Sequence, residues 1–104
     1  MQVSAVTRVI HNKVSNVSAG TAVRFVSQPT PIRSLLVYAN DANTGKVYIG
    51  GSGVNSTNTP PLSAGDQLPF EFVEFEGDIA DNLADFYIDA AVSGEGITYI
   101  AVKQ

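Results

Sequence analysis

The sequence predicts an all-β protein, an antiparallel sandwich of two packed sheets with seven or eight strands. Apolar and polar residues alternate with a period of two along most of the chain, as half-buried strands do. Clusters of Gly, Pro, Asn, Asp and Ser separate these short runs, and no strand–helix–strand rhythm links them. We therefore expect two layers of strands, with jelly-roll connections as one way of joining them.

One domain, residues 1–104, accounts for the whole chain, because 104 residues suffice for one modest core. There is no cysteine, so we expect neither a disulfide frame nor a thiolate metal site, which fits a reducing compartment. The N-terminus has no basic-then-apolar signal segment. No stretch approaches the roughly 20 apolar residues of a membrane span, so we expect no membrane contact.

The first half of the chain predicts three strands. Residues 3–10 alternate between apolar and polar side chains, and residues 21–27 are rich in β-branched and aromatic types. Residues 32–39, IRSLLVYA, form a largely apolar run and predict a central strand covered on both faces. Residues 1–16 are also a candidate for an extended arm that lies along a neighbouring protein.

A dense cluster of turn-forming residues follows at 40–46, NDANTGK, and the strand-like VYI comes directly after it. The span 32–49 therefore predicts a β-hairpin. Residues 50–61, GGSGVNSTNTPP, are too polar and glycine-rich for a core and predict a surface loop.

The second half predicts three further strands and one short helical piece. Leu68, Phe70 and Phe72 alternate with Pro69, Glu71 and Val73, which indicates a strand from 67 to 75. A single helical or 3₁₀ turn is expected near 79–84, because the segment is too short for a stable helix. Strands at 86–90 and 97–102 complete the chain.

Charge is distributed unevenly along the sequence. Residues 1–64 hold five basic side chains against Asp41 alone, a net charge of +4. Residues 65–104 hold nine acids against Lys103, a net charge of −8. The basic flank of one copy can therefore meet the acidic flank of another, unless folding interleaves the two halves. The overall charge of −4 disfavours nucleic-acid binding, which depends on neutralising many phosphates.

Motifs for catalysis or cofactor binding are missing from the sequence. His11 is the only histidine, and no phosphate loop, nucleophile elbow or ligand spacing accompanies it. We therefore expect no catalytic residue, no cofactor and no enzyme activity.

Eight carboxylates lie between residues 71 and 95 without an intervening cation. One hypothesis is a calcium site, because hard oxygen ligands suit this ion, and its candidate ligands are Glu74, Glu76, Asp78 and Asp81. Another is a glycosidase acid pair such as Glu71 and Glu74. The interpretation we prefer is a solvated acidic face that discourages edge-to-edge strand pairing.

The segments NTGKVYIGGSGV, PLSAGD and LADFYIDA resemble small accessory virion proteins of tailed bacteriophages. The resemblance covers roughly residues 32–102, and its matching positions are Asn43, Thr44, Gly45, Val47, Tyr48, Ile49, Gly50, Leu62, Ala64, Gly65, Leu83, Tyr87 and Ile88. It implies a β-sandwich that decorates or cements a capsid, or sits elsewhere on the particle. It implies no catalytic residue.

From the resemblance we expect a capsid decoration or cement protein, made in the host cytoplasm and located on the outer surface of a phage head. Its expected partners are the major capsid protein or other virion proteins, and further copies of itself, with a trimer favoured. The alternative is a carbohydrate- or receptor-binding module of a phage tail or fibre. The candidate partner contacts are Arg8, His11, Lys13, Tyr48, Val54, Asn55 and Asn58.

Overall fold

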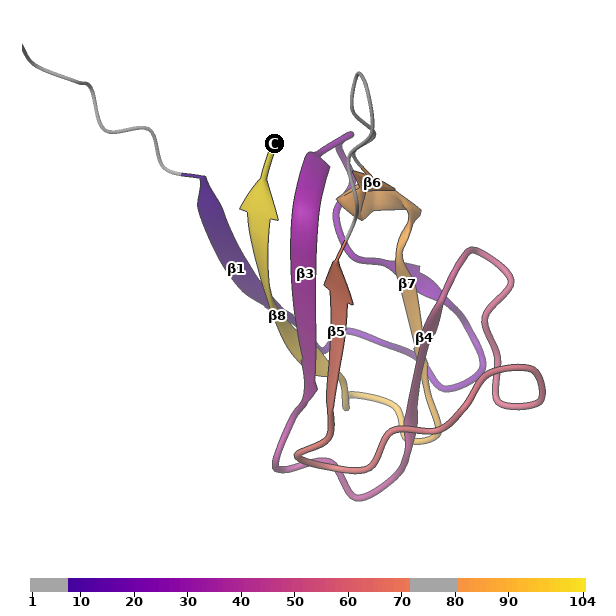
Figure 1. The fold of residues 1–104 in the computed structure, drawn as a ribbon. Coiled ribbons are helices and arrows are strands. Elements are labelled where there is room, and N and C mark those ends of the chain that lie inside the picture. The colour runs from indigo at the N-terminus through magenta and orange to yellow at the C-terminus, as the bar shows by residue number, and fades with distance from the viewer. Residues whose placement is uncertain (1–7, 72–80) are drawn as a thin grey trace, which may run out of the picture.

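The computed structural model describes residues 8–71 and 81–104, and within this part the only helical element is one 3₁₀ turn (Figure 1). The elements in chain order are β1 (Val9–Val14), β2 (Val23–Arg24), β3 (Pro31–Ala39), β4 (Val47–Gly50), β5 (Gln67–Glu71), β6 (Asp81–Asn82), η1 (Leu83–Asp85), β7 (Tyr87–Ala90) and β8 (Ile97–Lys103). All strand pairs are antiparallel. The two-sheet antiparallel sandwich predicted from the sequence is confirmed.

The strands form one larger and one smaller sheet. The larger sheet has the order β1–β8–β3–β5, and β6 also pairs with β3; the smaller sheet has the order β2–β7–β4. From β1 to β5, every strand lies in the sheet opposite to that of the strand before it. This repeated crossing carries the chain back and forth between the two layers of the sandwich.

The core lies between the sheets and takes alternate residues of the strands. On β3, Ile32, Leu35, Val37 and Ala39 are at most 2% exposed, while the residues between them keep part of their surface. The pairing with β8 shifts register between Ile32 and Ser34, and this irregularity lets both Ile32 and Leu35 face inward. The sequence prediction that this strand is covered on both faces is therefore wrong, because only one face is buried.

Four aromatic rings connect the two sheets. The ring of Phe25, which follows β2, lies 5.5 Å from Tyr99 on β8 and 6.0 Å from Phe86, which precedes β7. Phe86 in turn meets Phe70 of β5 edge-on, with ring centroids 5.1 Å apart. Such pairs contribute about 0.5–1.5 kcal/mol each beyond the area they bury. These four rings therefore fill the part of the core where the two sheets meet.

The hairpin predicted over residues 32–49 does not form, because β3 and β4 belong to different sheets. The turn residues between them bind the turn that precedes β8. The Asn43 side chain donates to the carbonyl of Gly96 at 2.8 Å, and the Glu95 carboxylate accepts from the N–H groups of Thr44 and Gly45. These contacts carry the chain across the core instead of back along β3.

The helical turn predicted near 79–84 is observed as a 3₁₀ turn at Leu83–Asp85, which overlaps the prediction only at residues 83 and 84. Asp81 and Asn82 form β6 instead, and residues 79 and 80 lie outside the described part. Asn82 caps the 3₁₀ turn, since Oδ1 accepts from the N–H of Ala84 at 2.9 Å. The same oxygen accepts from the N–H of Thr30 at 2.9 Å and so fixes the chain entering β3.

The first strand of the described residues is Val9–Val14, whereas the sequence predicted a strand at 3–10. Val9–Val14 pairs with β8 along its whole length, so these residues belong to the sheet and not to an extended arm. Residues 1–7, the remainder of the proposed arm, lie outside the described part. The strand predicted at 21–27 is reduced to Val23–Arg24.

Candidate docking surface

The candidate site is the surface of the larger sheet that faces away from the smaller one, here called the outer face. Successive side chains of a strand point to opposite sides of the sheet, and the core takes the set that includes Leu35, Val37 and Tyr99. The pairing register arranges the other set in three rows across β1, β8, β3 and β5: Val9–Val102–Ser34–Glu71, His11–Ile100–Leu36–Pro69 and Lys13–Thr98–Tyr38–Gln67.

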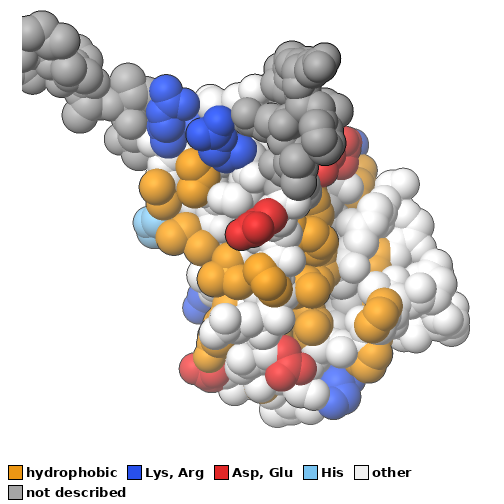
Figure 2. Space-filling view, viewed as in Figure 1, with side chains coloured by type: hydrophobic (Ala, Val, Ile, Leu, Met, Phe, Trp, Pro, Cys, Tyr) orange, Lys and Arg blue, Asp and Glu red, His pale blue; other side chains and the backbone are white. Residues whose placement is uncertain are grey.

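The centre of the outer face is apolar. Val9 and Ile100 keep 48% and 45% of their surface exposed, which is unusual for large hydrophobic side chains. Together with Leu36, Pro69 and their neighbours they line a shallow hollow of about 330 Å³. Figure 2 shows hydrophobic side chains running as a continuous band over this side of the molecule. Isolated exposed apolar residues are common, but a contiguous patch marks an interaction surface.

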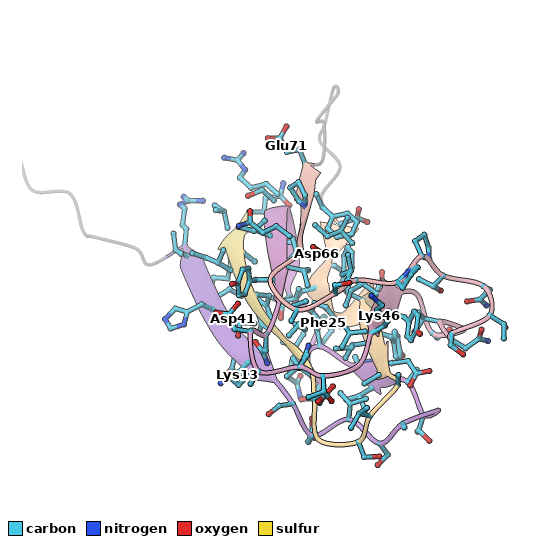
Figure 3. All side chains as sticks on the ribbon, turned by 90° about the horizontal axis from the view of Figure 1, so that it is seen from below. Lys13, Phe25, Asp41, Lys46, Asp66 and Glu71 are labelled. Carbon is cyan, nitrogen blue, oxygen red and sulfur yellow. The ribbon has the colours of Figure 1, made fainter. Side chains whose placement is uncertain are left out.

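The two margins of the outer face carry opposite charge. On the outer face itself, Lys13 projects from β1 and Glu71 from β5, whereas Arg8 is out of phase with Val9 and the Asp66 carboxylate accepts from the N–H of Ser63 in the turn before β5. In Figure 3, Lys13 is seen on β1 and Glu71 at the end of β5. The basic first half and acidic second half of the sequence thus persist as two margins of one surface.

Folding also interleaves some of the charges. Lys103, from the acidic half, donates its backbone N–H to the carbonyl of Arg8 at 2.7 Å. Glu71 and Asp81 pair with Ser34 and Ile32, the residues on either side of Arg33. Opposite charges therefore mix where β3 begins.

The edges of the larger sheet are unequal. β5 carries Pro69, which has no N–H to offer a further strand, and a proline at this position blunts an edge. β1 is a six-residue edge strand without proline. Its Lys13 N–H is engaged locally, because it donates to Oδ1 of Asn12 at 2.8 Å.

Three predicted contact residues lie together on β1 or next to it. Arg8, His11 and Lys13 are all exposed, and His11 and Lys13 project from the outer face. His11 and Lys13 therefore belong to the candidate docking surface, and Arg8, which is out of phase with Val9, lies beside it.

Two other predicted contact residues are buried. Tyr48 and Val54 keep only 8% and 7% of their surface exposed, so the aromatic platform that a carbohydrate- or receptor-binding module would need beside the loop 50–61 is not exposed. Val47 and Ile49, the neighbours of Tyr48 on β4, belong to the core, so Tyr48 is on the opposite side of the smaller sheet, paired with Asp89. The sequence pattern explains the error, because VYI is equally compatible with a strand covered on both faces and with a strand whose tyrosine is exposed.

Asn55 and Asn58 are exposed but serve the loop itself. Oδ1 of Asn55 accepts from the N–H and hydroxyl of Thr57 and from the N–H of Asn58. Asn58 accepts from the N–H of Asn55 and donates to the carbonyl of Gly53. These bonds fix the loop shape, as Asx turns do. The shallow depression beside them is lined by Gly50, Gly51, Gly53 and Val54, together with Asn58 and Thr59.

The acidic run gives no assembled metal site in the described residues, where no group of three His, Cys, Asp or Glu side chains lies close enough to hold an ion. Of the calcium candidates, Asp81 is exposed on β6, while Glu74, Glu76 and Asp78 lie outside the described part. The partner of Glu71 in the proposed glycosidase pair, Glu74, is likewise outside it.

Two ionisable groups near the turns have shifted pKa values. The N–H groups of Thr44 and Gly45 and the hydroxyl of Thr44 donate to the Glu95 carboxylate, and these bonds hold the pKa of Glu95 below its ordinary value. The Tyr38 hydroxyl donates to Oδ1 of Asp41, and this bond raises the pKa of Tyr38. Both interactions hold turns in place.

The sequence interpretation missed the apolar centre of the outer face. A signal was present in IRSLLVYA, where Leu36 lies out of phase with Leu35 and Val37. Apolar residues at both alternating sets of strand positions predict that both faces of β3 are buried. In the isolated chain only one of these faces is buried. An apolar sheet face that is exposed in the isolated chain has the same sequence pattern as a face that is buried within the chain.

Comparisons with known proteins add no further assignment: no family model, no curated protein and no solved structure matches this chain. Among the described residues, no helix has the length and apolar character needed to cross a membrane.

Proposed function

We propose that this chain is a structural protein of a bacteriophage virion that decorates the outer surface of the head and cements it. The observation that carries the proposal is the outer face, an apolar centre about Ile100 with charged margins, on a small rigid sandwich. A cement protein needs such a body and a surface that docks. Many modest contacts, repeated by symmetry, then add up to a large stabilisation of the shell.

The residues that resemble phage accessory proteins support a shared fold more than a shared site. Asn43 exchanges hydrogen bonds with Gly96, and Thr44 and Gly45 bind Glu95. Leu62 pairs with Val47 beside β4, and the later matches form η1 and β7. Every one of these roles is structural, which agrees with a family defined by its architecture.

In this proposal the partners are the major capsid protein or other virion proteins, and further copies of the chain, for which the resemblance favours three. Residues 1–7 and the exposed margin of β1 are the proposed contacts with the shell. The alternative, a carbohydrate- or receptor-binding module of a tail or fibre, is less favoured, because Tyr48, its candidate platform, is buried.

Sedimentation separates the two functions. Purified protein is mixed with undecorated heads and, separately, with host cells, and each mixture is pelleted. We expect saturable recovery with the heads, and decorated heads should resist heating better than bare ones. Binding to cells alone would reject the decoration proposal. A chain lacking residues 1–7, which keeps all of β1, should bind heads more weakly while melting at the same temperature; undiminished binding removes these residues from the contact.

A further inference from the structure

The backbone of β1 points every second N–H group away from the sheet. The N–H of Lys103 donates to the carbonyl of Arg8 at 2.7 Å, so these two residues form a hydrogen-bonded pair at the start of the β1–β8 ladder. In an antiparallel ladder such pairs alternate with pairs that make no bond to each other. The even-numbered residues of β1 are therefore bonded to β8, and the odd-numbered residues turn their N–H and carbonyl groups to the open edge. The residues that face the edge are Val9, His11 and Lys13.

This edge is open among the described residues, except at one end. β1 is the outermost strand of the larger sheet, and no described segment pairs with it on the side away from β8. Asn12 Oδ1 accepts from the N–H of Lys13 at 2.8 Å, so this donor is already used. The N–H groups of Val9 and His11 remain. They have the spacing of alternate residues, at which an added strand offers its carbonyls.

The side chains at this edge are basic. Neither β1 nor β8 carries an acidic side chain. Asp41, in the turn after β3, is engaged by the hydroxyl of Tyr38, and β8 lies between β3 and β1. A chain with an overall charge of −4 therefore concentrates positive charge along this one edge (Figure 2). The basic side chains on these two strands or next to them are Arg8, His11, Lys13 and Lys103.

We propose that the β1 edge binds an extended acidic segment of another protein, which joins the larger sheet as an additional strand. The segment pairs its backbone with Val9 and His11 and turns carboxylates towards His11 and Lys13. The inference deepens the proposed function, on which it rests for the source of the segment, a virion protein beside which the chain sits. The binding itself can be measured without a virion.

The two faces of the sheet set the sequence pattern of the segment. Residues directly opposite one another on paired strands have Cβ atoms about 4.5–5.5 Å apart. Carboxylates that project on the same side as His11 and Lys13 therefore meet opposite charge. On the other side lies Ile10, which packs against the core and keeps part of its surface exposed. An apolar residue of the segment covers Ile10 there, so the segment alternates acidic and apolar residues.

A second copy of the chain fits this edge poorly. Pairing of two β1 strands brings the basic side chains of both copies together, and no acidic side chain on β1 or β8 separates them. Like charges on neighbouring strands are destabilising, and basic residues commonly protect an edge strand against this kind of pairing. The same charges attract a strand of opposite charge, so they select the partner.

A synthetic peptide tests the inference. The probe is a capped peptide that alternates Glu and Val over the length of β1, and fluorescence anisotropy follows its binding to the full chain. Few backbone bonds and exposed charges give a weak complex, so we expect a dissociation constant between about 10 μM and about 1 mM at low salt. A peptide of alternating Lys and Val should not bind, nor should the Glu–Val peptide with methylated backbone nitrogens. Absence of Glu–Val binding at about 1 mM overturns the proposal. Equal binding of the methylated peptide overturns it as well, because charge alone would then suffice.

Amide hydrogen exchange locates the added strand. When about nine tenths of the chains are bound, exchange at the N–H groups of Val9 and His11 should slow about tenfold. The N–H groups of Ile10 and Asn12, which face β8, should change much less. Unchanged exchange at Val9 and His11 in the bound chain contradicts the assignment of the edge.

Two substitutions at His11 separate the backbone from the side chain. His11→Pro removes an N–H that β8 does not use, at a position where an edge strand tolerates proline. It should weaken binding of the Glu–Val peptide at least tenfold. His11→Ala keeps the N–H and should weaken binding less than about threefold, since it loses only an exposed side chain. Equal binding by the two variants shows that this N–H takes no part and refutes strand addition. The methylated peptide makes the same test without altering the protein.

A charge reversal tests the attraction. Lys13→Glu should weaken binding of the Glu–Val peptide about fivefold, because an exposed attraction becomes a repulsion. The matched control is Arg24→Glu on β2, an exposed residue in the other sheet whose reversal changes the net charge equally. The control should bind as the parent does. Equal losses in both variants show that the net charge of the chain attracts the peptide, and the edge does not.

Head binding and self-association are measured separately. If heads bind His11→Pro as well as they bind the parent, the strand addition is rejected and the decoration function stands. If the chain binds the peptide but no head, the function alone is rejected. In sedimentation equilibrium of the chain without peptide, a pair that forms with rising concentration and is lost in His11→Pro shows that a second copy occupies the edge, which also overturns the inference.

Discussion

Gly96, in the turn before β8, is a position where even a methyl group has no room. A Cβ built there lies 1.8 Å from the carbonyl oxygen of Val14 and 2.9 Å from Cα of Ser15. Real Cβ atoms stay beyond 3.0 Å, so for Gly96→Ala the two chain segments must separate by about 1.2 Å. Since the clashing atoms are backbone, no rotamer change can relieve the contact.

The same glycine is held in place from the other side. Asn43 Nδ2 donates to its carbonyl at 2.8 Å, its N–H donates to Oδ1 of Asn43 at 3.2 Å, and the N–H of Asn40 donates to the same carbonyl at 3.2 Å. A hydrogen bond contributes about 1 kcal/mol net, and overpacking costs about 1–3 kcal/mol. Some bonds survive a partial shift, so we expect Gly96→Ala to lower the free energy of unfolding by about 3–5 kcal/mol. This is a large part of the roughly 5–15 kcal/mol that stabilises a typical domain.

Thermal unfolding followed by circular dichroism measures this effect. At about 4–8 °C per kcal/mol for a domain of this size, Tm should fall by at least about 12 °C. Gly51→Ala and Gly53→Ala are the controls, because a Cβ at either position meets nothing within 4 Å. Their stability should change by less than about 0.5 kcal/mol. If Gly96→Ala stays within about 1 kcal/mol of the parent, the packing of the β1 end against this turn is looser than described.

Three further substitutions test side chains that hold the loops. Glu95→Gln should lower the free energy of unfolding at neutral pH. Because the folded state lowers the pKa of Glu95, the difference in free energy of unfolding between variant and parent should shrink as the pH falls below about 4.3. Urea titrations at two pH values measure this difference, and a difference that does not change with pH contradicts the prediction. Asn82→Ala should cost about 1–2 kcal/mol in the same assay, since the cap of η1 and the bond to Thr30 are both lost. The buried Asp89 carboxylate, 3% exposed, accepts from the N–H groups of Gly20 and of the following residue. Asp89→Ala should therefore lower the free energy of unfolding by about 2–3 kcal/mol, and Asp89→Asn, which keeps an acceptor oxygen, by less than about 1 kcal/mol. Equal losses in the two variants would show that the charge of Asp89 matters more than its hydrogen bonds.

The architecture was predictable because local pattern and fold agree over most strands. The alternation of Leu68 and Phe70 with Pro69 placed β5 with its correct inward face, and the core residues of β8 follow the same rule. The two packed sheets follow from strands that each have one apolar side to bury. None of this required knowledge of which strand pairs with which.

Pairing was less predictable, because it depends on contacts between distant residues. A turn-rich segment after a strand usually returns the chain along the same sheet. Here Asn43 finds its partners at Gly96, 53 residues away, and the chain crosses to the other sheet. Similarly, the burial of Tyr48 and the exposure of Ile100 depend on which surfaces other segments cover, and a period of two carries no information about that.

The position of β8 has a consequence for how the protein forms. This strand is the last to leave the ribosome, yet it lies between β1 and β3 in the larger sheet. The larger sheet therefore stays open between β1 and β3 until β8 has been synthesised, because no short connection joins these two strands directly. Such long-range closure is slow and exposes unpaired backbone meanwhile. Removing β8 (Ile97–Lys103) would leave β1 without a partner in the larger sheet, so the docking of β8 is the step that completes this sheet.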